Sequence, residues 1–202
     1  MTIPANKNPL VPVWSRRFTV IDVEMSSLLP DTDILEIAGV IVQPHRTEQA
    51  TSFEVLEEFD RYTKLEHPER ANPESLAITG YAEAQWQSHG AQALDLVLHE
   101  LQPKLQDTVL VGFNSHHDWA RLERAFFEHG LPDPFYYRRI DLQSVVMLLW
   151  PELGAEHGPS LSKACEHFGI ERHDAHHALA DARVTFALLQ ALTKKFHGSA
   201  RQ

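Results

Sequence analysis

Two acidic residues, Asp22 and Glu24, stand at the end of an apolar run that begins at Phe18. Because almost every residue of this run is apolar, it predicts a strand that is buried on both faces. Residues two apart on a strand project to the same side, so the two carboxylates lie together where the strand ends. Their charges repel each other, and a divalent metal ion with oxygen ligands would relieve that repulsion. We therefore expect the fold to bring further carboxylates to this strand end.

The composition indicates an acidic globular protein. The chain has 202 residues, 43% hydrophobic and 23% charged, which suits a single domain with one core. Its 28 acidic and 18 basic residues give a net charge of −10, so the overall field does not attract a polyanion. The single cysteine, Cys165, excludes an internal disulfide and a multi-cysteine zinc site. These features favour a cytoplasmic protein.

The domain boundaries follow from the two ends of the chain. We expect residues 1–14 to form a loose N-terminal arm, residues 15–197 a single domain, and residues 198–202 a tail. The arm is rich in proline and lacks both a basic opening and a long apolar core. It therefore resembles neither a signal peptide nor a membrane span, and no membrane partner is expected.

The pattern of apolar segments and turn residues predicts an α/β fold. Strands are expected at residues 18–23, 34–42, 51–62, 108–113 and 139–142. Helices are expected at 91–101, stopped by Pro103, at 115–129, 143–149 and 160–168, and onward from His176 or Ala178. Three strands followed by alternating helices and strands indicate a mixed five-stranded sheet flanked by helices. Functional sites in such sheets gather beyond the carboxyl ends of strands.

Two further aspartates are candidate metal ligands. Asp118 follows the fourth predicted strand, and Asp181 lies on the last predicted helix, beside its apolar stripe. An acid next to a buried face is unfavourable unless it is paired or bound to a cation. Each residue also has a structural alternative. Asp118 can form a capping box with Ser115, and Asp181 can be an exposed surface acid.

His176 is the candidate general base. It precedes Asp181 by five residues, which on a helix would turn it about 140° away from the aspartate. We therefore place it in the loop or first turn that enters the last helix, within reach of the same centre. A histidine can take a proton from water at neutral pH. The alternative is a histidine that only caps the loop.

Together these residues form an ordered set: Asp-x-Glu on the first strand, Asp after the fourth, and His-x4-Asp on the last helix. This set resembles the DEDDh family of 3′-to-5′ exonucleases, and the similarity covers residues 17–192. Residues 21–38 and 137–145 are similar to oligoribonucleases. Residues 161–170 are more similar to ribonuclease T and to the proofreading subunits of bacterial replicative polymerases, so the subfamily stays open.

The resemblance implies a ribonuclease H-like fold and a two-metal centre. Two divalent ions, Mg²⁺ or Mn²⁺, would be held by Asp22, Glu24, Asp118 and Asp181. His176 would be the general base, and the product a nucleoside 5′-monophosphate. Such ions stabilise both the attacking and the leaving oxygen. The family pattern gives substrate-binding roles to Met25, Ser26, Thr79, Gly80 and Asn114.

Two positions depart from the family pattern. Ser26-Ser27 stands where the family usually has Thr-Gly, and His117 stands where an aromatic residue usually precedes the second aspartate. Both positions border the expected substrate. They therefore bear on the identity of the substrate rather than on the metal chemistry.

The acidic charge suggests that a few nucleotides are held at the 3′ end of a single strand, because counterion release cannot hold a long polyanion here. RNA or short oligonucleotides are favoured, and a DNA-directed proofreading or repair exonuclease is the alternative. A homodimer stays open. Candidate cations are Arg121, Arg124, Arg138, Arg139 and Arg183, and candidate stacking surfaces are Tyr81, Trp86 and Trp119.

Two other classes of function are alternatives to the exonuclease. The thirteen histidines, including His116 and His117, fit an all-helical class of metal phosphohydrolases, but that class has no sheet. The fold can also be kept in a catalytically silent module that binds nucleic acid or a polymerase, although all five functional positions carry competent residues here.

Three nearby polar residues have less specific roles. Asp141, between a short strand and a helix, is expected to be an N-cap. Cys165 is expected to be a buried bystander. Glu36, on the second strand, either supports the acid cluster or faces solvent.

Overall fold

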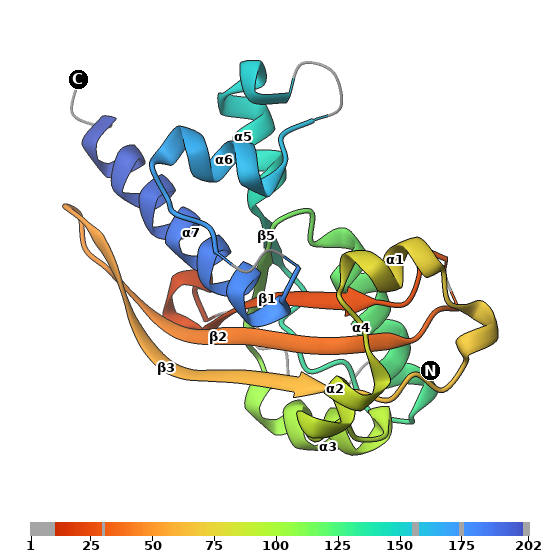
Figure 1. Ribbon diagram of the computed structural model, residues 1–202. Helices are drawn as coiled ribbons and strands as arrows, with labels where there is room; N and C mark the ends of the chain where they lie inside the picture. The colour runs from red at the N-terminus through yellow and green to blue at the C-terminus, as the bar shows by residue number, and fades with distance from the viewer. Residues whose placement is uncertain (1–10, 30, 155–157, 174–175, 200–202) are drawn as a thin grey trace.

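The computed structural model describes residues 11–29, 31–154, 158–173 and 176–199. Its strands form one sheet in the order β3-β2-β1-β4-β5 (Figure 1). Neighbours β1, β2 and β3 are antiparallel, whereas β4 is parallel to β1 and β5 to β4. The expected mixed five-stranded sheet is confirmed. The strands are β1 (Phe18–Met25), β2 (Ile34–Arg46), β3 (Thr51–Tyr62), β4 (Val109–Gly112) and β5 (Arg139–Asp141).

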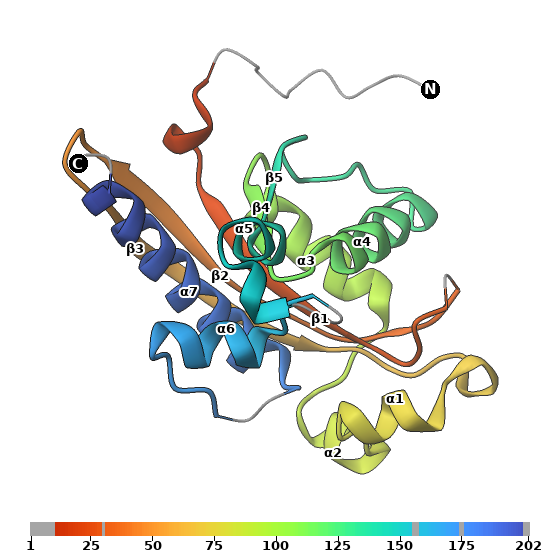
Figure 2. The same cartoon turned by 90° about the horizontal axis from the view of Figure 1, so that it is seen from above.

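Helices cover both faces of the sheet, with α3 and α4 on one side and α5, α6 and α7 on the other (Figure 2). The α-helices are α1 (Pro73–Ile78), α2 (Glu83–Ser88), α3 (Leu94–Leu105), α4 (His116–Glu128), α5 (Leu142–Leu149), α6 (Leu161–Phe168) and α7 (Ala178–Ser199). Short 3-10 helices lie at η1 (Val13–Ser15), η2 (Pro68–Arg70) and η3 (Pro151–Gly154). Within the described residues, no helix combines the length and the apolar character needed to cross a membrane.

The alternation of β1 decides which helices its acids face. Ile21 and Val23 belong to the core cluster that contains the buried residues of α3 and α4. Phe18 and Val20 belong to the cluster on the opposite face, which contains the buried residues of α7. Because side chains alternate along a strand, Asp22 and Glu24 continue the side of Phe18 and Val20. The two acids are therefore directed toward the face that α7 covers.

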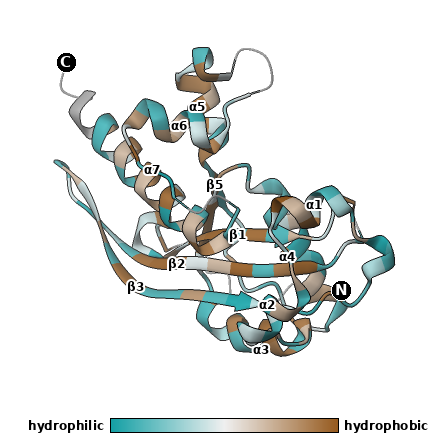
Figure 3. Cartoon of the chain, in the orientation of Figure 1, coloured by the Kyte–Doolittle hydropathy of each residue, from teal (hydrophilic) through white to brown (hydrophobic). Residues whose placement is uncertain are grey.

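The second strand is buried and the third is half exposed, as expected. Residues 34–42 of β2 are all buried, whereas Phe59 is the buried hydrophobic residue of β3. In Figure 3, β2 is mostly brown and β3 carries long teal stretches. Gly39 of β2 allows this packing, because a Cβ there would lie 2.8 Å from a ring carbon of Phe59. The edge strand thus shields β2 while facing solvent itself.

One predicted helix end was wrong, and one helix was not predicted. Pro103 does not stop the third helix but lies inside α3, which continues to Leu105. A proline removes a single backbone donor, and the buried side chains of Leu98, Leu101 and Leu105 hold the last turn against the sheet. Helix α2 was not predicted, because its buried stripe is little more than Trp86. Of the two starts proposed for the last helix, Ala178 is correct.

The expected arm and tail lie partly outside the described residues, at 1–10 and 200–202. Within the expected arm, Val13 and Trp14 pack against the core, and the ring of Trp14 lies 5.3 Å from that of Phe18. At the other end, α7 runs on to Ser199. Regular packing therefore begins before residue 15, and helix extends past residue 197.

Candidate active site

A cavity of about 510 Å³ opens at the carboxyl end of β1, beside the first turn of α4 and the start of α7. It brings together residues that are far apart in the sequence. All five residues predicted for metal binding and catalysis lie in its wall. The wall includes Asp22, Glu24, Met25, Asn114, His117, Asp118, Ser162, Arg172, His176 and Asp181.

The two acids of β1 lie among other negative charges. Burial is the main reason that the pKa of Asp22 is raised well above its ordinary value, and the charges of Asp118, Glu24 and Asp181 raise it further. Burial, followed by the charges of Asp181 and Asp118, raises the pKa of Glu24 to about 7. A cluster of buried carboxyl groups resists ionisation unless a cation compensates. The first strand therefore ends in a site that favours a positive charge.

Asp118 comes from α4, but it reaches back to β1. Its Oδ1 accepts a hydrogen bond of 3.1 Å from the backbone N–H of Val23, and burial raises its pKa to about 7. The capping box considered for Ser115 and Asp118 is not formed: the Ser115 side chain makes no capping bond in the described structure. Instead the N–H and Oγ of Ser115 donate to Asp141, at 3.1 and 3.4 Å.

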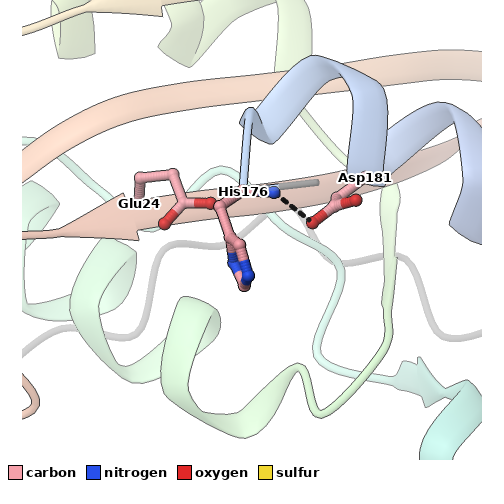
Figure 4. Close-up of side chains that lie close together, drawn as sticks. All are labelled: Glu24, His176 and Asp181. Atoms are coloured by element: carbon pink, nitrogen blue, oxygen red, sulfur yellow. Dashed lines mark hydrogen bonds between the residues drawn. The ribbon is translucent and has the colours of Figure 1, made fainter. Parts of the chain in front are cut away.

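Asp181 and His176 meet Glu24 from the start of α7, as Figure 4 shows. One ligand atom of each residue lies within 4.8 Å of the others. The backbone N–H of His176 donates to Asp181 Oδ2 at 3.2 Å. Asp181 is buried, so the alternative of an exposed surface acid is wrong. Two carboxylates this close together fit a divalent cation, and the imidazole lies beside them.

His176 has a backbone suited to this approach. Its φ is 69°, in the left-handed region that a non-glycine residue rarely adopts. It precedes the first residue of α7 by two positions, which confirms that it lies in the entering loop. Strained backbone persists where the surroundings over-determine it and is common at functional sites. This conformation brings the exposed imidazole close to the carboxylates of both Glu24 and Asp181.

Glu36 supports the cluster and does not face solvent. It is fully buried on β2, opposite Glu24 in the strand ladder. Its Oε1 accepts the backbone N–H of Ala178, the first residue of α7, at 3.0 Å. Burial and the neighbouring Asp60 raise its pKa to about 8. Glu36 therefore ties the start of the helix that carries Asp181 to the sheet.

Sequence reasoning missed Arg172. Its guanidinium pairs with both carboxylate oxygens of Asp181, at 3.0 and 2.6 Å. The residue lies in the loop after α6, whose C-cap is Gly169 at a φ of 66°. No spacing in the sequence singles it out, since the loop conformation brings it back to the cavity.

The proposed substrate-binding residues divide into two groups. Met25 and Asn114 line the acid cavity. Ser26 is fully buried, and its N–H and C=O bond to Asp33 and to Asn72. Thr79, the C-cap of α1, is also buried and donates to the carbonyl of Leu76, and Gly80 follows it at a φ of 66°. The structure brings the first group to the acids and leaves the second in the loop and α1 region.

The stacking surface suggested for Trp86 is wrong. Trp86 is 1% exposed, and its Nε1 donates to the carbonyl of Leu35 at 2.9 Å. Two of the proposed cations are also engaged elsewhere. The guanidinium of Arg139 lies over the ring of Trp119, at 3.6 Å, and Arg183 pairs with Glu58. Among the described residues, the arginine that does line the cavity is Arg172.

The predicted roles of Asp141 as an N-cap and of Cys165 as a buried residue are confirmed. Asp141 caps α5 by accepting the backbone N–H of Ser144 at 2.9 Å, and it also accepts the N–H of Ser115. Cys165 is buried in α6. Asp141 therefore braces the turn that delivers Asp118, without itself lining the acid cavity of the described structure.

The sheet order and its flanking helices are those of the ribonuclease H-like fold. A family model described as Exonuclease (RNase_T) matches residues 19–189. The chain therefore belongs to this exonuclease family. The match spans every residue assigned above to the acid cavity. A search of curated proteins found no match.

Solved structures with low sequence identity share the fold. Cell-death related nuclease 4 (CRN-4) aligns with a TM-score of 0.67 and 16% identity over 87% of this chain and 63% of that one. E. coli exonuclease I in complex with a dA16 oligonucleotide gives 0.68 and 21%, over 90% and 42%. A 3′-exonuclease in a structure on 3′-end recognition of a histone mRNA stem-loop gives 0.68 and 14%, over 92% and 67%. The chain thus spans under two thirds of the first two proteins.

Proposed function

We propose that this protein is a metal-dependent 3′-to-5′ exonuclease that releases nucleoside 5′-monophosphates from single-stranded nucleic acid. The observation that carries the proposal is the convergence of Asp22, Glu24, Asp118, Asp181 and His176 in one cavity at the end of β1. Membership of the exonuclease family agrees with it. So do the 3′-exonuclease and the oligonucleotide complex among the structures with the same fold.

The four carboxylates would hold two divalent ions, Mg²⁺ or Mn²⁺. Oxygen-rich sites suit these hard cations, and burial raises the pKa values of Glu24 and Asp118 to about 7, which a bound cation would oppose. When bound, two such ions would supply Lewis-acid stabilisation for the charge that develops on the phosphodiester.

His176 would take a proton from the attacking water at an imidazole nitrogen. Water then forms a bond to phosphorus, the bond to the 3′ oxygen of the preceding nucleotide breaks, and that oxygen takes up a proton. Glu36 keeps the start of α7 in place through the N–H of Ala178. It thereby positions both His176 and Asp181 without touching the substrate.

We propose RNA or short oligonucleotides as the first substrates, with single-stranded DNA as the alternative. The net charge of −10 disfavours electrostatic binding of a long nucleic-acid strand. Met25 and Asn114 line the cavity and can contact the terminal nucleotide. Ser26, Thr79 and Gly80 would then act by shaping the neighbouring loop.

The test is digestion of end-labelled single-stranded RNA and DNA of equal sequence, with Mg²⁺, Mn²⁺ or chelator. We expect stepwise loss from the 3′ end only with metal, and no loss when the 3′ end is blocked. Asp22→Ala should abolish activity, while Glu54→Ala, at an exposed acid of β3, should retain it. Digestion that survives both chelation and Asp22→Ala would refute the proposal. A folded, metal-binding protein without activity would favour a silent binding module.

A further inference from the structure

The guanidinium of Arg172 lies inside the acid cavity. Its Nε donates to Asp181 Oδ1 at 3.0 Å and its Nη2 to Asp181 Oδ2 at 2.6 Å, so the two groups pair fork to fork. Its Nη1 donates to Ser162 Oγ at 2.7 Å. The side chains of Arg172 and Asp181 are only 16% and 8% exposed. Bidentate, charge-assisted pairs of this kind are among the strong hydrogen-bonded contacts in proteins.

This pair occupies most of the ligand capacity of Asp181. An ionised carboxylate offers about four lone-pair positions. Oδ2 accepts from both Arg172 and the N–H of His176, and Oδ1 accepts from Arg172. Roughly one position in four is then left for a metal ion. A divalent ion on Asp181 would also lie within about 5 Å of the guanidinium and be repelled by it.

Its setting inside the cavity distinguishes Arg172 from Arg183. Arg183, two residues after Asp181 on α7, makes a similar fork with Glu58, but its side chain is 55% exposed. The charge of Arg172 also reaches the rest of the cluster, because it opposes the rise in the pKa of Glu24. A cation in this position acts on at least two acids of the proposed metal site, Asp181 and Glu24.

We propose that Arg172 competes with a divalent metal ion for Asp181, and that metal binding moves its guanidinium off this carboxylate. The inference rests on the proposed function, because it takes the acid cavity to be a metal site. Ser162 lies on α6 and lines the same cavity. Its hydroxyl can keep one guanidinium nitrogen while the fork leaves Asp181. Arg172 is thus a positioning residue that limits how tightly the site holds metal.

The experiment is titration of the full chain with Mn²⁺ alone by isothermal calorimetry. We expect Arg172→Gln to bind Mn²⁺ roughly ten-fold more tightly than wild type, because a repelling charge and a competing donor are lost. The matched control Arg183→Gln should stay within about two-fold of wild type, since its charge lies outside the cavity. In chelator, Arg172→Gln should unfold at a lower temperature than wild type, since Asp181 loses its counter-charge.

Each outcome decides the question. Unchanged or weaker Mn²⁺ binding by folded Arg172→Gln overturns the inference and leaves the proposed function standing. If that variant does not fold, Arg172→Lys carries the test, because it keeps the charge but cannot form the fork. Tighter binding by Arg172→Lys then supports competition, and equal or weaker binding overturns it. A wild-type protein that binds no Mn²⁺ would instead refute the metal centre itself.

Discussion

Glu24→Gln should make the protein more stable at pH 8 when metal is chelated. The pKa of Glu24 rises from 4.5 to about 7, chiefly through burial. The folded state therefore binds a proton more tightly than the unfolded state. Stability from this group is fully present below pH 4.5 and is lost as the pH rises through about 7. A glutamine at this position stays neutral, so this pH-dependent loss of stability does not occur in Glu24→Gln.

The magnitude follows from the pKa. A rise from 4.5 to about 7 corresponds to roughly 3 kcal/mol of unfolding free energy. The pKa of Asp118 is raised as well. Its protonation is linked to that of Glu24, so the two costs do not add. We expect the loss of stability between pH 5 and 8 to be smaller in Glu24→Gln than in wild type by about 3 kcal/mol or less.

The assay is urea unfolding in chelator, followed by tryptophan fluorescence, at intervals from pH 5 to 8. Most titrating groups are common to both proteins, so the difference between them reports on Glu24 and the groups coupled to it. Glu54→Gln, at an acid that is 63% exposed, is the control and should show the wild-type slope. Adding Mn²⁺ at pH 8 should stabilise wild type more than Glu24→Gln. Equal slopes for wild type and Glu24→Gln would refute the reasoning about the acid cluster.

Three further predictions concern separate contacts. His176→Ala should lower turnover by roughly 10² to 10⁴-fold while calorimetry shows Mn²⁺ affinity within about five-fold of wild type; an unchanged rate would assign the base elsewhere. Trp86→Phe removes the hydrogen bond to Leu35 and should cost about 1–3 kcal/mol in urea unfolding with turnover retained, and a neutral effect would contradict this. Leu101→Ala, at a fully buried site of α3, should cost about 2–5 kcal/mol, and a loss below about 1 kcal/mol would show that the core repacks.

Much of the fold could be predicted because its determinants are local. The apolar run of β1 and the continuous burial of β2 follow directly from residue type and period. Helix α6 begins with Ser160 accepting the N–H of Lys163 and ends at Gly169. The bound that failed, at Pro103, failed because packing of the buried leucines outweighed one missing donor.

The residues of the candidate site could be predicted, but not all of their contacts. The acids of β1 share a side because a strand alternates, and the loop position of His176 followed from helical geometry. The spacing of residues could not separate the capping role of Asp118 from a role in the cavity. That choice depended on Val23, whose N–H reaches Asp118 from another element.

The sequence by itself determined which chemical groups meet: an acid pair at a strand end, two further aspartates and a histidine before the last helix. Only the tertiary structure decided how those groups are held. Arg172 forms a bidentate pair with Asp181, and Glu36 accepts a hydrogen bond from the N–H of Ala178. Trp86 is buried in the core. These contacts depend on where loops and helices pack against the sheet. Periodicity reports the face of one element, and it carries no information about the partner that another element brings to it.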